Sequence, residues 1–134
     1  MKKGTFSFDY NVSKVHKQVL LFFRKKYPQW ELFQNYTIKM NNKSLYADIY
    51  STNPFKFIAE INGAQHYEFV KFYHASQEDF QNAQENDVIK KEWCMINRFA
   101  FIEIDGRKKF DEDEFDCVLM STIMDNLKKD HEVD

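Results

Sequence analysis

Two carboxylates on neighbouring predicted strands are the residues of this sequence best suited to chemistry. Asp48 lies in the alternating run 45–50, and Glu60 lies near the end of the run 56–61. A short turn at 52–54 joins the runs as an antiparallel hairpin, so residue 48 is expected opposite residues 59 to 60. Facing carboxylates destabilise one another unless a cation lies between them, and Mg²⁺ or Mn²⁺ favours such an oxygen-only arrangement with few protein ligands. The pair therefore predicts a divalent-metal site.

The residues that follow Glu60 add groups that can move a proton or hold a phosphate. Gly63 permits a sharp exit from the strand and places Gln65 and His66 just beyond the carboxylates. An imidazole there is suited to act as general base towards an attacking water, and Gln65 can orient that water or contact phosphate without adding charge. Ordinary structural roles stay open: Asp48 and Glu60 as strand charges, and His66 as a packed side chain bonded to a backbone carbonyl.

The elements expected to position these residues follow from apolar spacing. Residues 10–26 predict an amphipathic helix with a basic face, capped by Asn11 or Ser13 and stopped by Pro28. Its lysines are either a solvated face or a phosphate-contacting one. Residues 36–40, 45–50 and 56–61 predict a three-stranded antiparallel meander, with turns at 41–43 and 52–54.

The second half predicts a helix, a strand and a last helix. The helix covers 79–98 and directly precedes a strand at 99–104, which can therefore join the sheet in parallel. Acidic residues 111–114 cap the last helix, which runs to about 128, and residues 129–134 form an acidic tail. The fold class is thus α/β (α+β): one domain over 1–134, with its core at about 10–128, a mixed sheet of about four strands, and the order α-β-β-β-α-β-α. The inner side of the 79–98 helix is expected to consist of Phe80, Ala83, Val88, Ile89, Trp93 and Ile96.

Composition limits the classes of function. The 134 residues carry a net charge of −2, which excludes a protein that holds nucleic acid by bulk positive charge, so any DNA contact must come from local patches. Cys94 and Cys117 have no metal-site spacing and are expected to be inert, buried thiols in a reducing, cytoplasmic compartment. No signal peptide is apparent, and the longest apolar run, 19–23, is too short to cross a membrane. The basic patches available for DNA are Lys14, Lys17, residues 24–26, Lys71, Lys90, Lys91 and residues 107–109.

Several strings in this chain together resemble a known group of nucleases. Asp48 followed by Glu60-Ile61-Asn62 resembles the core of the PD-(D/E)XK nuclease superfamily. The longer strings 47–50, 60–67 and 86–94, with Asn97, are similar to small phage and bacterial proteins related to the very-short-patch repair endonuclease and to the phage homing endonucleases named for an EDxHD active site. The similarity covers roughly residues 28–105. It implies a restriction-endonuclease-like fold and a Mg²⁺-dependent or Mn²⁺-dependent DNA endonuclease of the homing or repair-nicking type.

The resemblance also implies roles for individual residues. Asp48 and Glu60 correspond to the metal ligands and His66 to the catalytic histidine, which Asp87 would support from the following helix. Glu31 is the candidate for the first glutamate of the motif. Gln65 would share the catalytic site, and the residues expected to contact nucleic acid are Lys71, His74, Lys90 and Lys91. His74 has the alternative role of a structural residue in an aromatic loop, and Asp87 with Lys90 that of a helix-surface pair.

Two departures from the family pattern leave a second hypothesis open. The superfamily's lysine is absent at Asn62, so Gln65 or His66 must do its work or cleavage is lost. The Arg-Asp pair often found before the helix is Asn86-Asp87 here, which removes one cation. The alternative is a catalytically reduced nuclease-like fold that binds DNA or a host protein as a phage regulator. The small size also leaves open a homodimer or a subunit of a larger phage or repair assembly.

Overall fold

Four strands form one mixed sheet in the order β1-β2-β3-β4. The computed structural model describes residues 13–62 and 77–132 and, for side chains, extends to residue 129. The element order confirms the predicted α-β-β-β-α-β-α arrangement of one α+β domain. The elements are α1 (Lys14–Lys26), β1 (Glu31–Met40), β2 (Lys43–Asn53), β3 (Phe57–Asn62), α2 (Gln77–Asn97), β4 (Ala100–Asp105) and α3 (Glu112–Glu132).

The sheet topology follows from the lengths of the connections. β1, β2 and β3 form the predicted antiparallel meander, and Asn41 and Asn42 make a two-residue turn between Met40 and its partner Lys43. Both asparagines have positive φ, 54° and 62°, as the turn type that matches strand twist requires. β4 pairs in parallel with β3, as expected for a strand that is entered from a helix.

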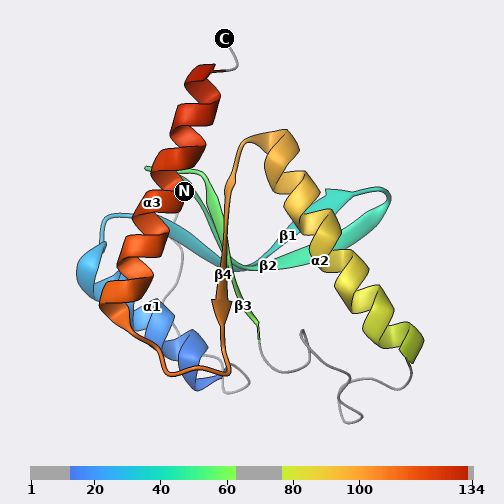
Figure 1. The fold of residues 1–134 in the computed structure, drawn as a ribbon, viewed down its shortest axis with the longest axis horizontal. Helices are drawn as coiled ribbons and strands as arrows, with labels where there is room; N and C mark the ends of the chain where they lie inside the picture. The colour runs from blue at the N-terminus through green and yellow to red at the C-terminus, as the bar shows by residue number, and fades with distance from the viewer. Residues whose placement is uncertain (1–12, 63–76, 133–134) are drawn as a thin grey trace.

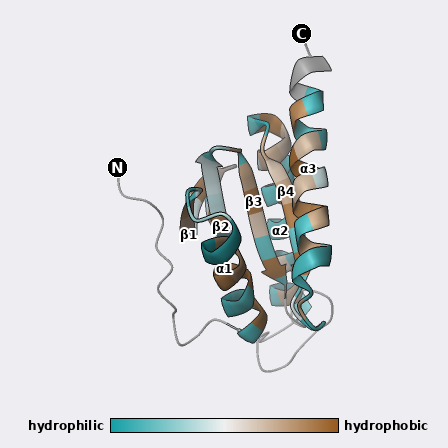
Figure 2. Ribbon diagram, turned by 90° about the vertical axis from the view of Figure 1, so that its left-hand side faces the viewer, coloured by the Kyte–Doolittle hydropathy of each residue, from teal (hydrophilic) through white to brown (hydrophobic). Residues whose placement is uncertain are grey.

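Helices cover both faces of the sheet (Figures 1 and 2). α1 and α3 pack on one face, where Phe57, Ala59 and Ile61 of β3 enter their apolar cluster. α2 packs on the other face, where Ile58 joins a second cluster. All of β3 is buried, which is typical of a central strand covered on both sides. Glu60 lies two residues after Ile58 along β3, so its side chain points to the same face of the sheet, the α2 face.

The inner side of α2 differs from the predicted one. Val88 and Ile96 are 55% and 67% exposed, whereas Cys94 is buried. Lys90 lies one turn before Cys94 and also turns inward, with a side chain only 12% exposed. Because a lysine occupies part of the inner face of α2, the spacing of apolar residues does not identify that face correctly. The prediction that Val88 and Ile96 face inward is therefore wrong. Cys117 is exposed, so the expectation that both thiols are buried holds only for Cys94.

The start of α3 is capped as its acidic run predicts. Glu114 N donates to Asp111 Oδ1 at 3.0 Å, and three acidic residues occupy the first turn. Asp111→Ala should lower the free energy of unfolding by about 1 kcal/mol, because one amide of the first turn loses its acceptor. Urea unfolding of the variant measures this, with Asp125→Ala in the exposed middle of the helix as control. Equal unfolding midpoints for wild type and Asp111→Ala would contradict the cap.

The end of α2 is closed by a residue in the left-handed region. Arg98 has φ 61°, while Phe99 N donates to Cys94 O at 2.8 Å, the hydrogen-bond pattern of a Schellman motif. Glycine takes this conformation without the steric cost borne by a side chain. Arg98→Gly should therefore raise the unfolding free energy by about 0.5–1 kcal/mol, measured by thermal and urea denaturation. A lower stability than wild type would show that the arginine side chain outweighs the backbone cost.

Candidate active site

β2 and β3 exchange side-chain hydrogen bonds at Asp48 and Glu60. The paired positions of the two strands end at Ile49 and Ala59. One step further, Asp48 N donates to Glu60 Oε2 at 2.7 Å, and Ile61 N donates to Asp48 Oδ2 at 2.9 Å. Each carboxylate thus takes the amide of the opposite strand in place of a ladder bond. The predicted juxtaposition of the two acids is confirmed.

The other neighbour of Asp48 is also irregular. The β1–β2 pairs pass from Gln34 with Ile49 to Tyr36 with Ala47, which leaves Asn35 opposite Asp48 outside the paired positions. Asn35 has φ 52°, in the left-handed region. Asparagine tolerates this conformation better than most residues, and backbone outliers of this kind cluster at functional sites. The regular pairing of β2 is therefore interrupted at Asp48 on the side of β1 and on the side of β3.

A lysine reaches the carboxylates from the helix above them. Lys90 Nζ of α2 forms an ion pair with Glu60 Oε1, and both side chains are largely buried. Asn62, where the family resemblance leads one to expect a lysine, instead donates through its amide to Glu103 Oε2 at 2.9 Å. A lysine is therefore present at the two acids, but it comes from α2 and not from β3. The structure thus places Lys90 within the site as the largely buried partner of Glu60.

The electrostatics of the site set the charge states of Glu60 and Cys94. Burial, helped by the nearby charge of Asp48, raises the pKa of Glu60, while Lys90 and the Asp48 amide act in the opposite direction. Burial raises the pKa of Cys94 to about 12, so this thiol stays protonated near neutral pH. With both acids ionised, Asp48, Glu60 and Lys90 sum to one negative charge. Such a site attracts a cation.

His16 belongs to the same neighbourhood, although the sequence pattern does not single it out. It lies on α1, close enough to Asp48 for the carboxylate's charge to act on the ring, and burial lowers the pKa of the imidazole. Its Nε2 atom is buried and has no hydrogen-bond partner among the described residues. Its neighbours Val15 and Val19 are buried core residues, and a lone histidine among such positions is typical of a packed side chain. Only the fold shows that this part of α1 faces Asp48.

The described residues supply few protein ligands for a divalent cation at this site. In the parts of the chain that the structure describes, 13–62 and 77–129, no three His, Cys, Asp or Glu side chains gather closely enough to hold a metal. Mg²⁺ sites commonly use one or two carboxylates and complete the shell with water and substrate phosphate. Asp48 Oδ2 accepts from Ile61 N, and within the described residues no hydrogen bond to Asp48 Oδ1 is found. The residues thus fit a cation held by few protein groups.

The remaining predicted site residues lie in different places. Glu31 pairs with Asn53, five residues along β2 from Asp48 (53 minus 48), about 16 Å at the rise of a strand, so the structure does not bring it to the acids. Asp87 lies on α2 one turn before Lys90 and is partly buried. Lys91 pairs with Glu103 at 2.8 Å on the exposed side of α2. Gln65, His66, Lys71 and His74 lie outside the described residues.

Several of the predicted basic patches are paired with acids. Lys25 and Lys26 at the end of α1 contact Glu112 and Asp116 of α3 at 3.0 and 2.5 Å. Tyr27 also donates to Asp116 at 2.6 Å, and burial raises the pKa of this tyrosine to about 12. The acidic start of α3 therefore binds the basic end of α1. That end of the helix has less charge available for phosphate than its sequence indicates.

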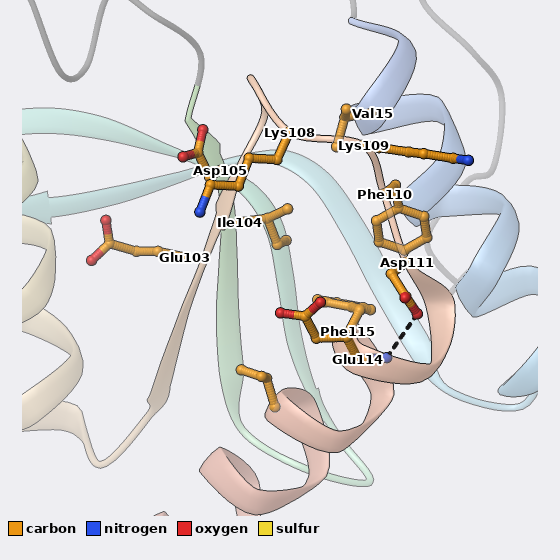
Figure 3. A pocket seen from close by; sticks show the side chains of 11 residues that line it. Val15, Glu103, Ile104, Asp105, Lys108, Lys109, Phe110, Asp111, Glu114 and Phe115 are labelled. Carbon is orange, nitrogen blue, oxygen red and sulfur yellow. Dashed lines mark hydrogen bonds between the residues drawn. The ribbon is translucent and has the colours of Figure 1, made fainter.

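A pocket of about 190 Å³ lies near the end of β4 (Figure 3). Its apolar lining includes Val15, Ile104 and Phe115, and Lys109 extends from it towards α1. At its edge Arg107 holds Asp105 in a bidentate pair, and hydrogen bonds from Arg107 lower the pKa of that carboxyl to about 2. Neither Asp48 nor Glu60 lines it. The pocket is therefore separate from the pair of acids.

None of the described helices combines the length and the apolar composition that a bilayer-spanning helix needs.

Comparison with known proteins assigns no family. Over 66 residues the chain is 39% identical to the uncharacterized protein 307L of Invertebrate iridescent virus 6, a match that covers 49% of this chain and 33% of the viral protein. The matched stretch thus spans about a third of that relative's length. No protein-family model matches the chain, and no solved structure matches it.

Proposed function

We propose that this protein is a metal-dependent DNA endonuclease that hydrolyses phosphodiester bonds at the site formed by Asp48 and Glu60. The observation that carries the proposal is the exchange of hydrogen bonds by the two acids across β2 and β3, with Lys90 on Glu60. Two carboxylates this close together on buried strands lower the free energy of unfolding. A catalytic role accounts for their presence better than a contribution to stability does.

Each residue has a defined task in this proposal. Asp48 and Glu60 hold the divalent cation, and the backbone amides that they accept fix their orientation. When bound, Mg²⁺ or Mn²⁺ supplies Lewis-acid stabilisation of the charge that develops on the phosphate. Lys90 keeps Glu60 in place and contributes a positive charge at the position where a polyanion must approach. His66, braced by Asp87, is proposed as the base that takes the proton of the attacking water, and Gln65 as its orienting group.

Nicking of supercoiled plasmid tests the proposal. Purified protein should convert the plasmid to open circles with Mg²⁺ or Mn²⁺ and fail to do so with EDTA. Glu60→Ala should abolish the reaction. Glu103→Ala is the matched control, because Glu103 lies beside Glu60 in the parallel register but is exposed and pairs with Lys91. Equal cutting by Glu60→Ala and Glu103→Ala would refute the assignment.

One observation favours a second candidate function, a nuclease-like fold that binds DNA or a host protein without cutting. Both oxygens of Glu60 are already engaged, one by Lys90 and one by the Asp48 amide. An ammonium group thus takes the place that a metal would need on this carboxylate. Calorimetric titration with Mg²⁺ and Mn²⁺ separates the two functions, since the binding module has no need of a metal site. DNA binding without metal binding or nicking would favour this candidate.

A further inference from the structure

The outer part of the β1–β2 hairpin, residues 36–47, continues past the strands that pair with β3. β2 pairs with β3 at 49–51, whereas its pairing with β1 continues for five further pairs, up to Met40 with Lys43. Figure 1 shows this outer hairpin running behind α2, away from α1 and α3. Within the described ranges, the outer hairpin is therefore a two-stranded ribbon that projects from the sheet.

The two faces of the outer hairpin differ in burial. Ile38 and Leu45 are buried in the cluster that α2 covers, and Lys43 Nζ donates to Asn86 Oδ1 of α2 at 3.3 Å. The alternate positions form a second face, and their side chains are exposed: Thr37, Lys39, Ser44 and Tyr46. The ring of Tyr46, the largest of these side chains, belongs to a residue that is 54% exposed. α2 thus supports one face of the ribbon, while the other faces solvent in the described structure.

The exposed face consists of two cross-strand pairs. Thr37 lies opposite Tyr46, and Lys39 lies opposite Ser44. Side chains of residues directly opposite one another on paired strands point to the same side of a sheet. The face therefore combines one ammonium group, three hydroxyl groups and one aromatic ring.

The charge of the outer hairpin is complementary to a polyanion. Residues 34–47 contain Lys39 and Lys43 and no Asp or Glu, although the whole chain has a net charge of −2. Lysine, hydroxyl and tyrosine side chains are common donors to the phosphate and sugar oxygens of DNA. Asn41 and Asn42 form the turn at the tip, and asparagine amides can read the edge of an adenine base. The groups of this ribbon thus match those that contact DNA.

The dimensions of the outer hairpin select the form of DNA. Paired strands lie about 4.8 Å apart, and the major groove of duplex DNA, about 12 Å wide, admits a two-stranded ribbon. Tyr46 precedes Asp48 by two residues on β2, a rise of about 7 Å. A duplex that rests on the exposed face therefore lies next to the strand position of the proposed catalytic acid.

We infer that the exposed face of the outer hairpin binds the major groove of duplex DNA, with Lys39 on a phosphate and Tyr46 against the base edges. This inference rests on the proposed function, because it names the surface by which the nuclease holds its substrate. Neither residue belongs to the strings that resemble the nuclease group.

Binding of a short duplex in EDTA tests the inference without reference to cleavage. The full-length protein is titrated into a fluorescein-labelled duplex of mixed sequence, and anisotropy is measured at several salt concentrations. The variants are Lys39→Gln and Tyr46→Ala, with Lys128→Gln near the end of α3 as control, because Lys128 is also an exposed lysine. A second duplex of the same sequence carries bulky groups on the cytosine C5 atoms, which occupy the major groove. Circular dichroism and thermal unfolding check that the variants are folded.

The inference predicts a different effect for each variant. Lys39→Gln should weaken binding and reduce the slope of log affinity against log salt concentration by about 0.9, the value for one phosphate contact. Tyr46→Ala should weaken binding of the duplex and leave that slope unchanged, since the ring carries no charge. Lys128→Gln should bind like wild type. The C5-substituted duplex should bind at least about tenfold more weakly than the plain one, because several base contacts are blocked together.

The outcomes separate this inference from the proposed function. Absence of duplex binding by wild type, equal affinities of Lys39→Gln, Tyr46→Ala and Lys128→Gln, or equal binding of the two duplexes would each overturn the inference. Plasmid nicking by the same wild-type protein with Mg²⁺ or Mn²⁺ would in that case leave the proposed function standing. The predicted losses of binding together with an uncut plasmid would support the hairpin surface and refute the nuclease.

Discussion

Asp48→Asn is expected to reduce metal-dependent nicking by at least about a hundredfold, the loss typical of removing one preorganised electrostatic group. The change is nearly isosteric, and the asparagine side-chain oxygen can still accept from Ile61 N. What it removes is the negative charge and the strong metal-ligand character of the carboxylate. Folding should therefore change little while catalysis is lost. Plasmid nicking at saturating Mg²⁺ or Mn²⁺ measures the effect.

A matched substitution distinguishes the loss of a negative charge at the site from the loss of a negative charge elsewhere on the sheet. Glu103→Gln removes a carboxylate from β4 directly beside Glu60 in the parallel register, where the side chain is exposed and pairs with Lys91. Its nicking rate should stay near that of wild type. If Asp48→Asn cut as fast as Glu103→Gln, Asp48 would have no part in catalysis, and its hydrogen bond to Ile61 would be its whole role.

Lys90→Met is expected to lower the free energy of unfolding by about 3 kcal/mol in metal-free protein. The substitution keeps most of the apolar stem but removes the only described cation on Glu60, a carboxylate whose side chain is 4% exposed. Breaking a buried pair is costly because the remaining charge is left without compensation. Urea unfolding in EDTA measures the loss. Glu60→Gln in the same background should recover part of it, because the buried group is then neutral.

The loss of unfolding free energy in Lys90→Met should depend on pH in a defined direction. The pKa of Glu60 is already raised by burial and by Asp48, and removing Lys90 takes away a cause that lowers it. A carboxyl whose folded pKa lies above its unfolded value favours folding below the unfolded pKa, and that contribution is lost as pH rises through the folded pKa. Lys90→Met should therefore be closest to wild type in acid and diverge as the pH rises. A difference that shrinks with rising pH would contradict the ion pair.

Lys91→Met is the natural control for the lysine substitution. Lys91 follows Lys90 on α2, but its partner Glu103 is 39% exposed and its own side chain is 51% exposed. Exposed ion pairs contribute about 0–1 kcal/mol, so the unfolding free energy of this variant should be close to that of wild type.

Unfolding of Lys90→Met in the presence of Mn²⁺ is a further test of the ion pair. If a cation binds the acids, it should restore stability to Lys90→Met far more than to Lys91→Met.

Local signals were sufficient to predict the elements and one contact of the site. Alternation, turn residues and capping groups act over a few positions, so the order of helices and strands and the cap at Asp111 follow from neighbouring residues. The approach of Asp48 to Glu60 follows from the short hairpin between them, because a short turn fixes the register of its strands. The parallel addition of β4 follows from the helix that precedes it.

Tertiary packing alone decided which distant groups meet these acids. Lys90 is 30 residues from Glu60, and its inward direction depends on how α2 lies on the sheet, which also exposes Val88 and Ile96. His16 is 32 residues from Asp48 (48 minus 16), and the charge of Asp48 acts on its ring only because α1 packs against the sheet. The sequence by itself determined the two acids and the strands that carry them, since those depend on local periodicity. The choice of lysine and histidine depends on the packing of helices against the sheet, which no short-range pattern encodes.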